Sequence, residues 1–196
     1  MFKLVEMEDM VRIPPSLFKL PPKEAAVEVL REKYEGRILR DIGLAITILD
    51  VELDPKGVLV PGDGATYHRI RARALVFAPE PQEVVEGEVT VVAEYGVEVR
   101  IGPLDGFIHR SQLHEKETFS YNREQAMWLG EKTGRILRRG DRVRARVVQV
   151  SYGTRGPKLR VGLTMRQPFL GKLEWIEEEI RKMEGAKGAE KKGAST

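Results

Sequence analysis

The segments that decide the fold are Gly87-Glu88-Val89, Glu94-Tyr95-Gly96-Val97-Glu98-Val99 and Gly106-Phe107-Ile108-His109-Arg110-Ser111. Apolar and polar residues alternate in them and glycines punctuate them, which is typical of short β-strands joined by tight turns. Two further segments of this kind lie nearer the C-terminus. Together the five predicted strands indicate a small closed β-barrel without exposed strand edges; they cover residues 84–95, 97–101, 105–111, 142–150 and 158–166. The polar stretch 113–137, between the third and fourth strands, is predicted to form two helical turns.

The chain before the barrel, residues 1–81, is predicted to form a separate α+β domain. Strands are expected over 2–13, 44–53 and 65–78. A helix over 23–35 is expected to begin after Pro21-Pro22 and to end at Gly36. In the last strand, aliphatic residues alternate with arginines, so one face of the sheet is buried, and the arginines form a solvated face or pair with acids; the two sets are Ile70, Ala72, Ala74, Val76 and Arg69, Arg71, Arg73.

A hairpin tip is predicted where two turns follow each other closely, at Asp54–Gly57 and Pro61–Gly64. Between the turns lie Val58, Leu59 and Val60. Three exposed aliphatic residues are unusual for an idle surface loop and suggest a partner surface.

The C-terminal region, residues 168–196, is predicted to contain a short helix over 169–183 with an apolar stripe at Leu173, Ile176 and Ile180. Residues 186–196 show no apolar periodicity and are expected to be a disordered tail. The domains are therefore expected at 1–81, 82–167 and 168–196.

The composition excludes several classes of protein. Of 196 residues, 41% are hydrophobic and 32% are charged, and none is cysteine. The absence of cysteine excludes disulfide scaffolds and thiolate nucleophiles or metal ligands. No apolar run approaches the length of a membrane span, and acids near the N-terminus argue against a secretory signal. A cytoplasmic protein is expected.

Positive charge is concentrated in one place. Residues 135–146 hold six arginines and one acid, Asp141, in a chain whose net charge is +3. Such a patch suits phosphate contacts, and it equally suits the solvated surface of a thermostable protein.

Catalysis has little support in the sequence. No nucleophile elbow, P-loop or zinc-protease helix is present, and the three histidines have no ligand spacing. A stand-alone ribonuclease would need clustered acids, which are lacking. No metal or cofactor is expected.

The order of motifs in residues 84–166 resembles the S1 RNA-binding domain, an OB-fold barrel. The resemblance implies that single-stranded RNA lies across aromatic rings beside basic residues. Glu98 departs from the family, because many S1 domains carry an aromatic residue there, and its carboxylate repels phosphate. Phe107 also suits a packing role, and His109 suits a turn. The positions that match the RNA-binding surface are Tyr95, Arg100, Phe107, His109, Arg142, Arg144 and Arg146.

The whole chain resembles the family of archaeal RNA polymerase stalk subunits E, whose eukaryotic counterpart is the seventh subunit of RNA polymerase II. Residues 61–69 and 162–176, together with the S1 segment, carry this resemblance. It implies an α+β protein: an RNP-like α/β domain, an S1-type OB-fold barrel and a C-terminal helix. It also implies a non-catalytic subunit that docks on the polymerase core, forms a heterodimer with the smaller of the two stalk subunits (F) and binds emerging RNA.

In that family the docking tip corresponds to residues 55–64, so the expected contacts are Val58, Leu59, Val60, Pro61, Gly62, Asp63 and Gly64. The alternative function is that of an S1-bearing RNA-decay factor, such as an exosome cap, or a translation factor. Such proteins share the barrel, and they are not expected to carry the 61–69 or 165–175 segments.

Overall fold

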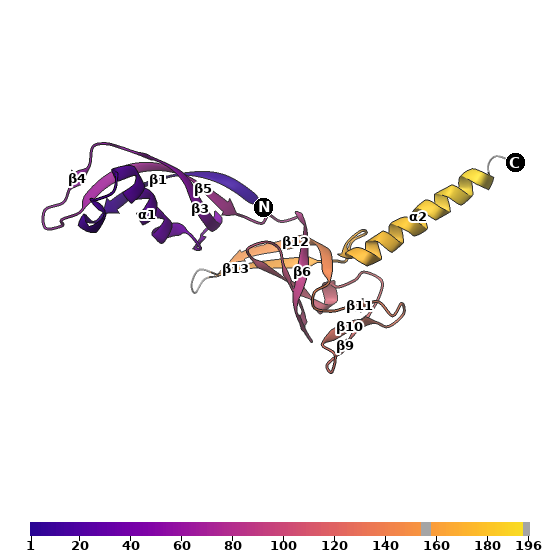
Figure 1. Ribbon diagram of the computed structural model, residues 1–196. Helices are drawn as coiled ribbons and strands as arrows, with labels where there is room; N and C mark the ends of the chain where they lie inside the picture. The colour runs from indigo at the N-terminus through magenta and orange to yellow at the C-terminus, as the bar shows by residue number, and fades with distance from the viewer. Residues whose placement is uncertain (154–157, 194–196) are drawn as a thin grey trace. The chain divides into compact units, whose positions relative to one another are not determined.

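The computed structural model describes residues 1–153 and 158–193, and these residues form two compact units (Figure 1). The first consists mainly of residues 1–79 and the second mainly of residues 80–151 and 160–193. The barrel strands lie in the second unit, except for the last residue of β12 and the first of β13, and the C-terminal helix also belongs to the second unit.

The first unit is a twisted antiparallel sheet with one helix on one face. Its strands follow the order β1-β5-β3-β2, and the short β4 pairs with β5. The elements in chain order are β1 (Phe2–Ile13), the 3-10 turn η1 (Pro15–Leu17), α1 (Pro22–Tyr34), β2 (Ile38–Leu39), β3 (Gly43–Leu53), β4 (Val58–Leu59) and β5 (Thr66–Phe77).

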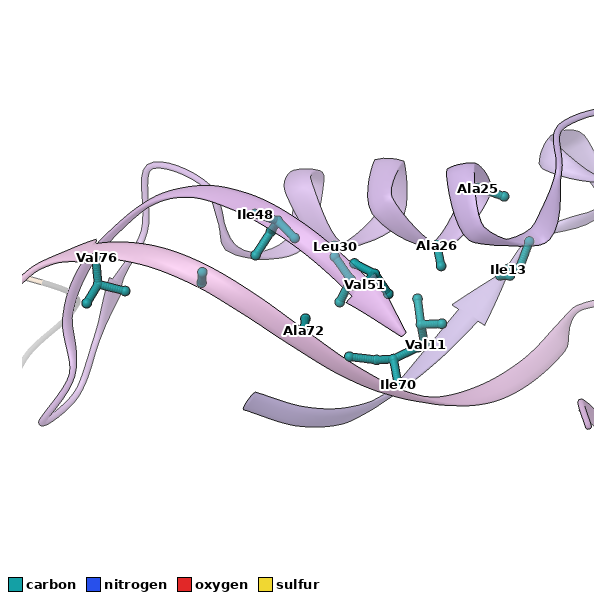
Figure 2. Close-up of a cluster of buried hydrophobic side chains, with 11 residues drawn as sticks. Val11, Ile13, Ala25, Ala26, Leu30, Ile48, Val51, Ile70, Ala72 and Val76 are labelled. Carbon is teal, nitrogen blue, oxygen red and sulfur yellow. The ribbon is translucent and has the colours of Figure 1, made fainter. Parts of the chain in front are cut away.

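The core of this unit lies between α1 and the sheet (Figure 2). Helix α1 presents small residues and one leucine to the strands, so the helix approaches the sheet closely. Each fully buried Leu, Ile or Val contributes about 1.5–3 kcal/mol relative to an exposed position. The core residues are Val11, Ile13, Ala25, Ala26, Leu30, Ile48, Val51, Ile70, Ala72, Ala74 and Val76.

The alternation predicted for β5 is confirmed. Its aliphatic residues are buried and its arginines lie on the opposite, exposed face. Two of the arginines pair with acids on neighbouring strands: Arg71 Nη2 lies 2.8 Å from Glu8 Oε1, and Arg73 Nη2 lies 3.5 Å from Asp50 Oδ2. On this face, ion pairs therefore link β5 to both neighbouring strands.

The second unit contains the predicted barrel. Five strands close in the order β6-β7-β8-β13-β12, because β12 pairs both with β6 and with β13, and β14 extends the sheet beyond β12. The barrel strands are β6 (Val84–Ala93), β7 (Gly96–Arg100), β8 (Asp105–His109), β12 (Arg142–Tyr152) and β13 (Leu159–Thr164), with η2 (Arg110–Gln112) after β8 and β14 (Gly171–Lys172) at the end.

The prediction of helical turns over 113–137 is wrong. This segment forms a three-stranded sheet of β9 (Phe119–Asn122), β10 (Met127–Gly130) and β11 (Ile136–Leu137). Buried Trp128 and Leu137 stand opposite each other on β10 and β11, and the Tyr121 ring packs against Trp128 with ring centroids 5.3 Å apart. Cross-strand packing of these aromatic side chains outweighs the helical propensity of the charged residues around them.

The C-terminal helix is longer than predicted. Helix α2 spans Leu173–Gly193, so the expected disordered tail is helical through residue 193. Alanine, lysine and glutamate predominate beyond residue 185, and they favour helix even without an apolar stripe. The helix starts later than expected, because Phe169 and Gly171 have φ values of 61° and 126°. Residues 194–196, and the part of the predicted loop at 154–157, lie outside the described residues.

Candidate docking and nucleic-acid surfaces

The predicted tip exposes its aliphatic residues. β4 pairs with β5 through Val58 opposite Tyr67 and Leu59 opposite Thr66. Val58, Leu59 and Val60 are 59%, 69% and 44% exposed. A two-residue strand thus carries an apolar surface into solvent, where it has no core of its own to join.

The tip loop is held in place by Asp63. Its carboxylate accepts hydrogen bonds from Arg12 Nε and Nη2 at 2.8 and 2.7 Å, from the Tyr67 hydroxyl at 2.7 Å and from the Ala65 amide at 3.1 Å. The Arg12 guanidinium and the Tyr67 hydroxyl hold the pKa of Asp63 well below its usual range. The expected tip residues Pro61, Gly62 and Gly64 therefore belong to a fixed loop.

A second apolar loop lies against the tip, and sequence reasoning missed it. A Cβ added at Gly64 would lie 3.5 Å from Cγ of Pro15, so the connection between β1 and α1 contacts the tip loop. Phe18 on this connection is 51% exposed. The signal that could have found it is the pair of Pro-Pro steps at 14–15 and 21–22, which stiffen a loop carrying apolar residues.

On the barrel, three aromatic rings lie together. The ring centroids of Tyr95 and Phe107 are 5.7 Å apart, and those of Phe107 and His109 are 6.4 Å apart. Tyr95 is 59% exposed, Phe107 is half-buried and His109 is exposed. We call Tyr95, Phe107 and His109 the aromatic patch. Stacking on a base needs an open π-face, and Tyr95 and His109 are the exposed rings of the patch.

Gly96 allows the aromatic patch to form. Its φ is 155°, and a Cβ here would lie 2.2 Å from the Ile108 carbonyl oxygen and 2.8 Å from Cζ of Phe107. The Phe107 ring therefore packs directly over the backbone of β7. Any side chain at this position would displace the ring or separate the strands.

Charged residues adjoin the aromatic patch. Glu98 on β7 stands directly opposite Phe107 on β8, and its carboxylate has no partner within the described residues. Arg100 stands opposite Asp105, and its Nε lies 3.3 Å from Asp105 Oδ1. The carboxylate that departs from the S1 pattern is thus beside the central ring.

The predicted arginine row lies elsewhere on the barrel. Arg142, Arg144 and Arg146 point to one side of β12, which pairs with β6, β13 and β14. Arg144 Nε and Nη2 both bind Glu86 Oε1, at 2.9 and 2.7 Å, and Arg142 lies 3.8 Å from Glu86 Oε2. The three rings are therefore brought together, whereas the arginine row is separated from β8 by a strand.

Neither a metal site nor a membrane helix is found in the described parts of the chain. Residues 1–153 and 158–193 contain no group of three or more His, Asp or Glu side chains arranged to hold a metal ion. No helix in those ranges is both long and apolar enough to cross a bilayer.

Comparisons with known proteins match both units. The family described as "SHS2 domain found in N terminus of Rpb7p/Rpc25p/MJ0397" matches residues 8–64, and the "S1 RNA binding domain" matches residues 78–162. Together with the closed barrel and the sheet-and-helix unit, these matches confirm the predicted fold class. They define a two-domain protein with an SHS2 domain followed by an S1 domain.

Proteins similar in sequence over most of their length show which family within this class the chain belongs to. DNA-directed RNA polymerase subunit Rpo7 of Saccharolobus solfataricus is 46% identical over 176 residues, which cover 90% of this chain and 97% of the relative. Rpo7 of Sulfolobus acidocaldarius is 41% identical over 182 residues, covering 93% and 98%. RNA polymerase III subunit RPC8 of Saccharomyces cerevisiae is 32% identical over 187 residues, covering 91% and 87%. The chain belongs to the family of RNA polymerase subunits that contains Rpo7 and RPC8.

Proposed function

We propose that this chain is the non-catalytic stalk subunit of a cytoplasmic DNA-directed RNA polymerase, and that it docks on the polymerase core through its tip. The observation that carries the proposal is the fixed apolar tip in a chain related to Rpo7 over nearly its full length. An aliphatic surface that is held in one conformation loses little entropy on binding and gains from burial. Phosphoryl transfer and its magnesium then belong to other subunits.

The tip surface comprises Val58, Leu59 and Val60. Exposed Phe18, on the connection whose Pro15 contacts the tip loop, is the fourth apolar residue in this proposal. Pro61, Gly62, Asp63 and Gly64 keep the loop in its binding conformation rather than supplying apolar area. The smaller of the two stalk subunits (F) is the second protein partner in this proposal, and the two chains form a heterodimer. Single-stranded RNA is the third partner, and it binds the aromatic patch.

The relatives give no support to the alternative of an RNA-decay or translation factor, because Rpo7 and RPC8 are RNA polymerase subunits. The S1 family match is common to both functions and does not separate them.

Reconstitution with polymerase core tests the docking. Replacing Val58, Leu59 and Val60 together with Ser is expected to abolish co-elution with the core, while the circular dichroism spectrum and RNA binding stay unchanged. Leu49→Ser is the matched control, because Leu49 is 54% exposed in the same unit and lies outside the tip. Normal incorporation of the triple variant would refute docking through the tip.

A further inference from the structure

A groove in the second unit lies next to the aromatic patch and has no assigned role. It has a volume of about 530 Å³ and lies between the β6–β7 turn, η2 and the β9–β10 hairpin. It adjoins the patch: its lining residues Glu94 and Arg110 are next in sequence to Tyr95 and His109, and the Arg110 amide donates a hydrogen bond to the Tyr95 carbonyl at 3.0 Å. Six of its lining residues carry the argument: Glu94, Arg110, His114, Phe119, Tyr121 and Arg123.

The groove combines aromatic rings with cations. His114, Phe119 and Tyr121 are half-buried and line its wall. Arg110 is exposed, and its guanidinium has no partner within the described residues. Rings that can stack on bases, together with cations that can contact phosphates, are the features of single-strand-binding channels.

The acids of the groove are occupied. The Glu117 carboxylate is turned toward the β10–β11 turn, where it accepts hydrogen bonds from the Lys132 and Thr133 amides at 3.1 and 2.7 Å. Glu94 pairs with Arg123 at 2.8 Å, and their side chains are 59% and 77% exposed. An ion pair this exposed contributes little, so a phosphate can replace Glu94 as the partner of Arg123.

We propose that single-stranded RNA continues from the aromatic patch into this groove, where the β9–β10 hairpin supplies a second set of base and phosphate contacts. This inference rests on the RNA-binding part of the proposed function. The sheet of β9, β10 and β11, which lies between the barrel strands β8 and β12 in the sequence, then helps to hold RNA beyond the barrel. A longer RNA therefore gains contacts that a short one lacks.

Photocrosslinking of the full-length chain to a decamer of 5-iodouridine tests where the RNA lies. Crosslinks are expected at Phe119 or Tyr121 in the groove as well as at Tyr95 or Phe107 in the patch. Crosslinks confined to the patch would overturn the groove while leaving the proposed function intact. A decamer that neither binds nor crosslinks would remove RNA binding itself, and the groove with it.

Affinity gives an independent readout. Arg123→Gln is expected to weaken binding of a uridine decamer about fivefold at 0.1 M salt and to flatten its log K versus log[salt] slope by about 0.7, the value of one phosphate contact on a single strand. Binding of a uridine tetramer, which the patch alone can hold, is expected to stay unchanged. Arg139→Gln is the matched control, because Arg139 is exposed and does not line the groove. Equal losses for both oligomers, or none for the decamer, would overturn the inference.

Discussion

The tip and the aromatic patch both expose apolar side chains, and they are built in different ways. The tip carries three consecutive aliphatic residues, two on β4 and Val60 directly after it, and the Asp63 carboxylate holds the loop from the side. The patch carries one ring from the β6–β7 turn, Tyr95, and two from β8, Phe107 and His109, and the barrel holds them. Aliphatic side chains have no π-face for a base, so the first surface suits a protein and the second suits RNA.

Electrostatics separates the two regions further. At the tip, the carboxylate of Asp63 is neutralised by Arg12 and serves the loop itself. At the patch, the Glu98 carboxylate is unpaired within the described residues and stands opposite the central ring. The charge of Asp63 in the tip loop is thus already paired in the free chain. The patch, by contrast, retains an unpaired carboxylate that would repel the phosphates of a bound RNA.

The largest expected effect is a loss of stability, and one glycine in each region is substituted to compare it. Gly96→Ala is expected to lower the free energy of unfolding by about 3 kcal/mol, because backbone strain and overpacking add. Gly62→Ala in the tip loop is expected to cost only about 1–2 kcal/mol, since its φ is 88° and nothing lies within 4 Å of an added Cβ. Urea unfolding of the two variants measures both values. Equal losses would show that the close contacts of Gly96 with Ile108 and Phe107 are unimportant for stability.

Much of this comparison could be predicted from the sequence. Period-two alternation predicted which face of β5 is buried, and glycine-flanked strands indicated the barrel. The tip followed from two close turns around Val58, Leu59 and Val60. Each of these features depends on residues near one another in the chain.

What could not be predicted depends on distant residues. Arg12 and Asp63 are 51 positions apart, so no local pattern reveals that they fix the tip. Glu86 lies 58 positions before Arg144, and its hydrogen bond to Arg144 leaves fewer free cations in the arginine row than the sequence suggests. The sheet over 119–137 was missed because its strands are short and because aromatic contacts stabilise it, among them the contact of Phe119 with Trp175, which is 56 positions away in the sequence.

The next effect concerns stacking on the patch. Phe107→Ala is expected to weaken binding of single-stranded RNA by roughly tenfold to a hundredfold, because base stacking on an aromatic side chain contributes about 1–3 kcal/mol. Phe169→Ala is the control, since Phe169 is 41% exposed in the same unit and is not in the patch. Fluorescence anisotropy at fixed salt measures the change. Assembly with the polymerase core is expected to remain normal, which separates the patch from the tip.

A smaller effect is expected from the arginine row on β12, and the arginine row of the first unit serves as its control. Changing Arg142, Arg144 and Arg146 to Gln is expected to flatten the salt slope of RNA binding by about 1.4, which corresponds to two phosphate contacts. Two rather than three are expected, because Arg144 is already bound to Glu86 through both nitrogens.

The control row has the same spacing. Changing Arg69, Arg71 and Arg73 to Gln removes the same charge from the first unit and is expected to leave the slope unchanged. If both triple variants flatten the slope equally, the effect is one of net charge, and the row on β12 does not contact RNA.

The smallest effect is expected from removing the charge of Glu98, the unpaired carboxylate that distinguishes the patch from the tip. Glu98→Gln keeps the size of the side chain and removes its charge. A unit charge about 7 Å from a bound phosphate costs about 0.6 kcal/mol in water, so RNA binding is expected to tighten about threefold. Glu178→Gln on α2 changes the net charge equally at an exposed position that is not in the patch. Because salt screens such a charge, the gain should shrink as ionic strength rises. A gain of the same size in both variants would assign the effect to net charge. No gain in either would mean that RNA does not cross the face on which Glu98 and Phe107 stand opposite each other.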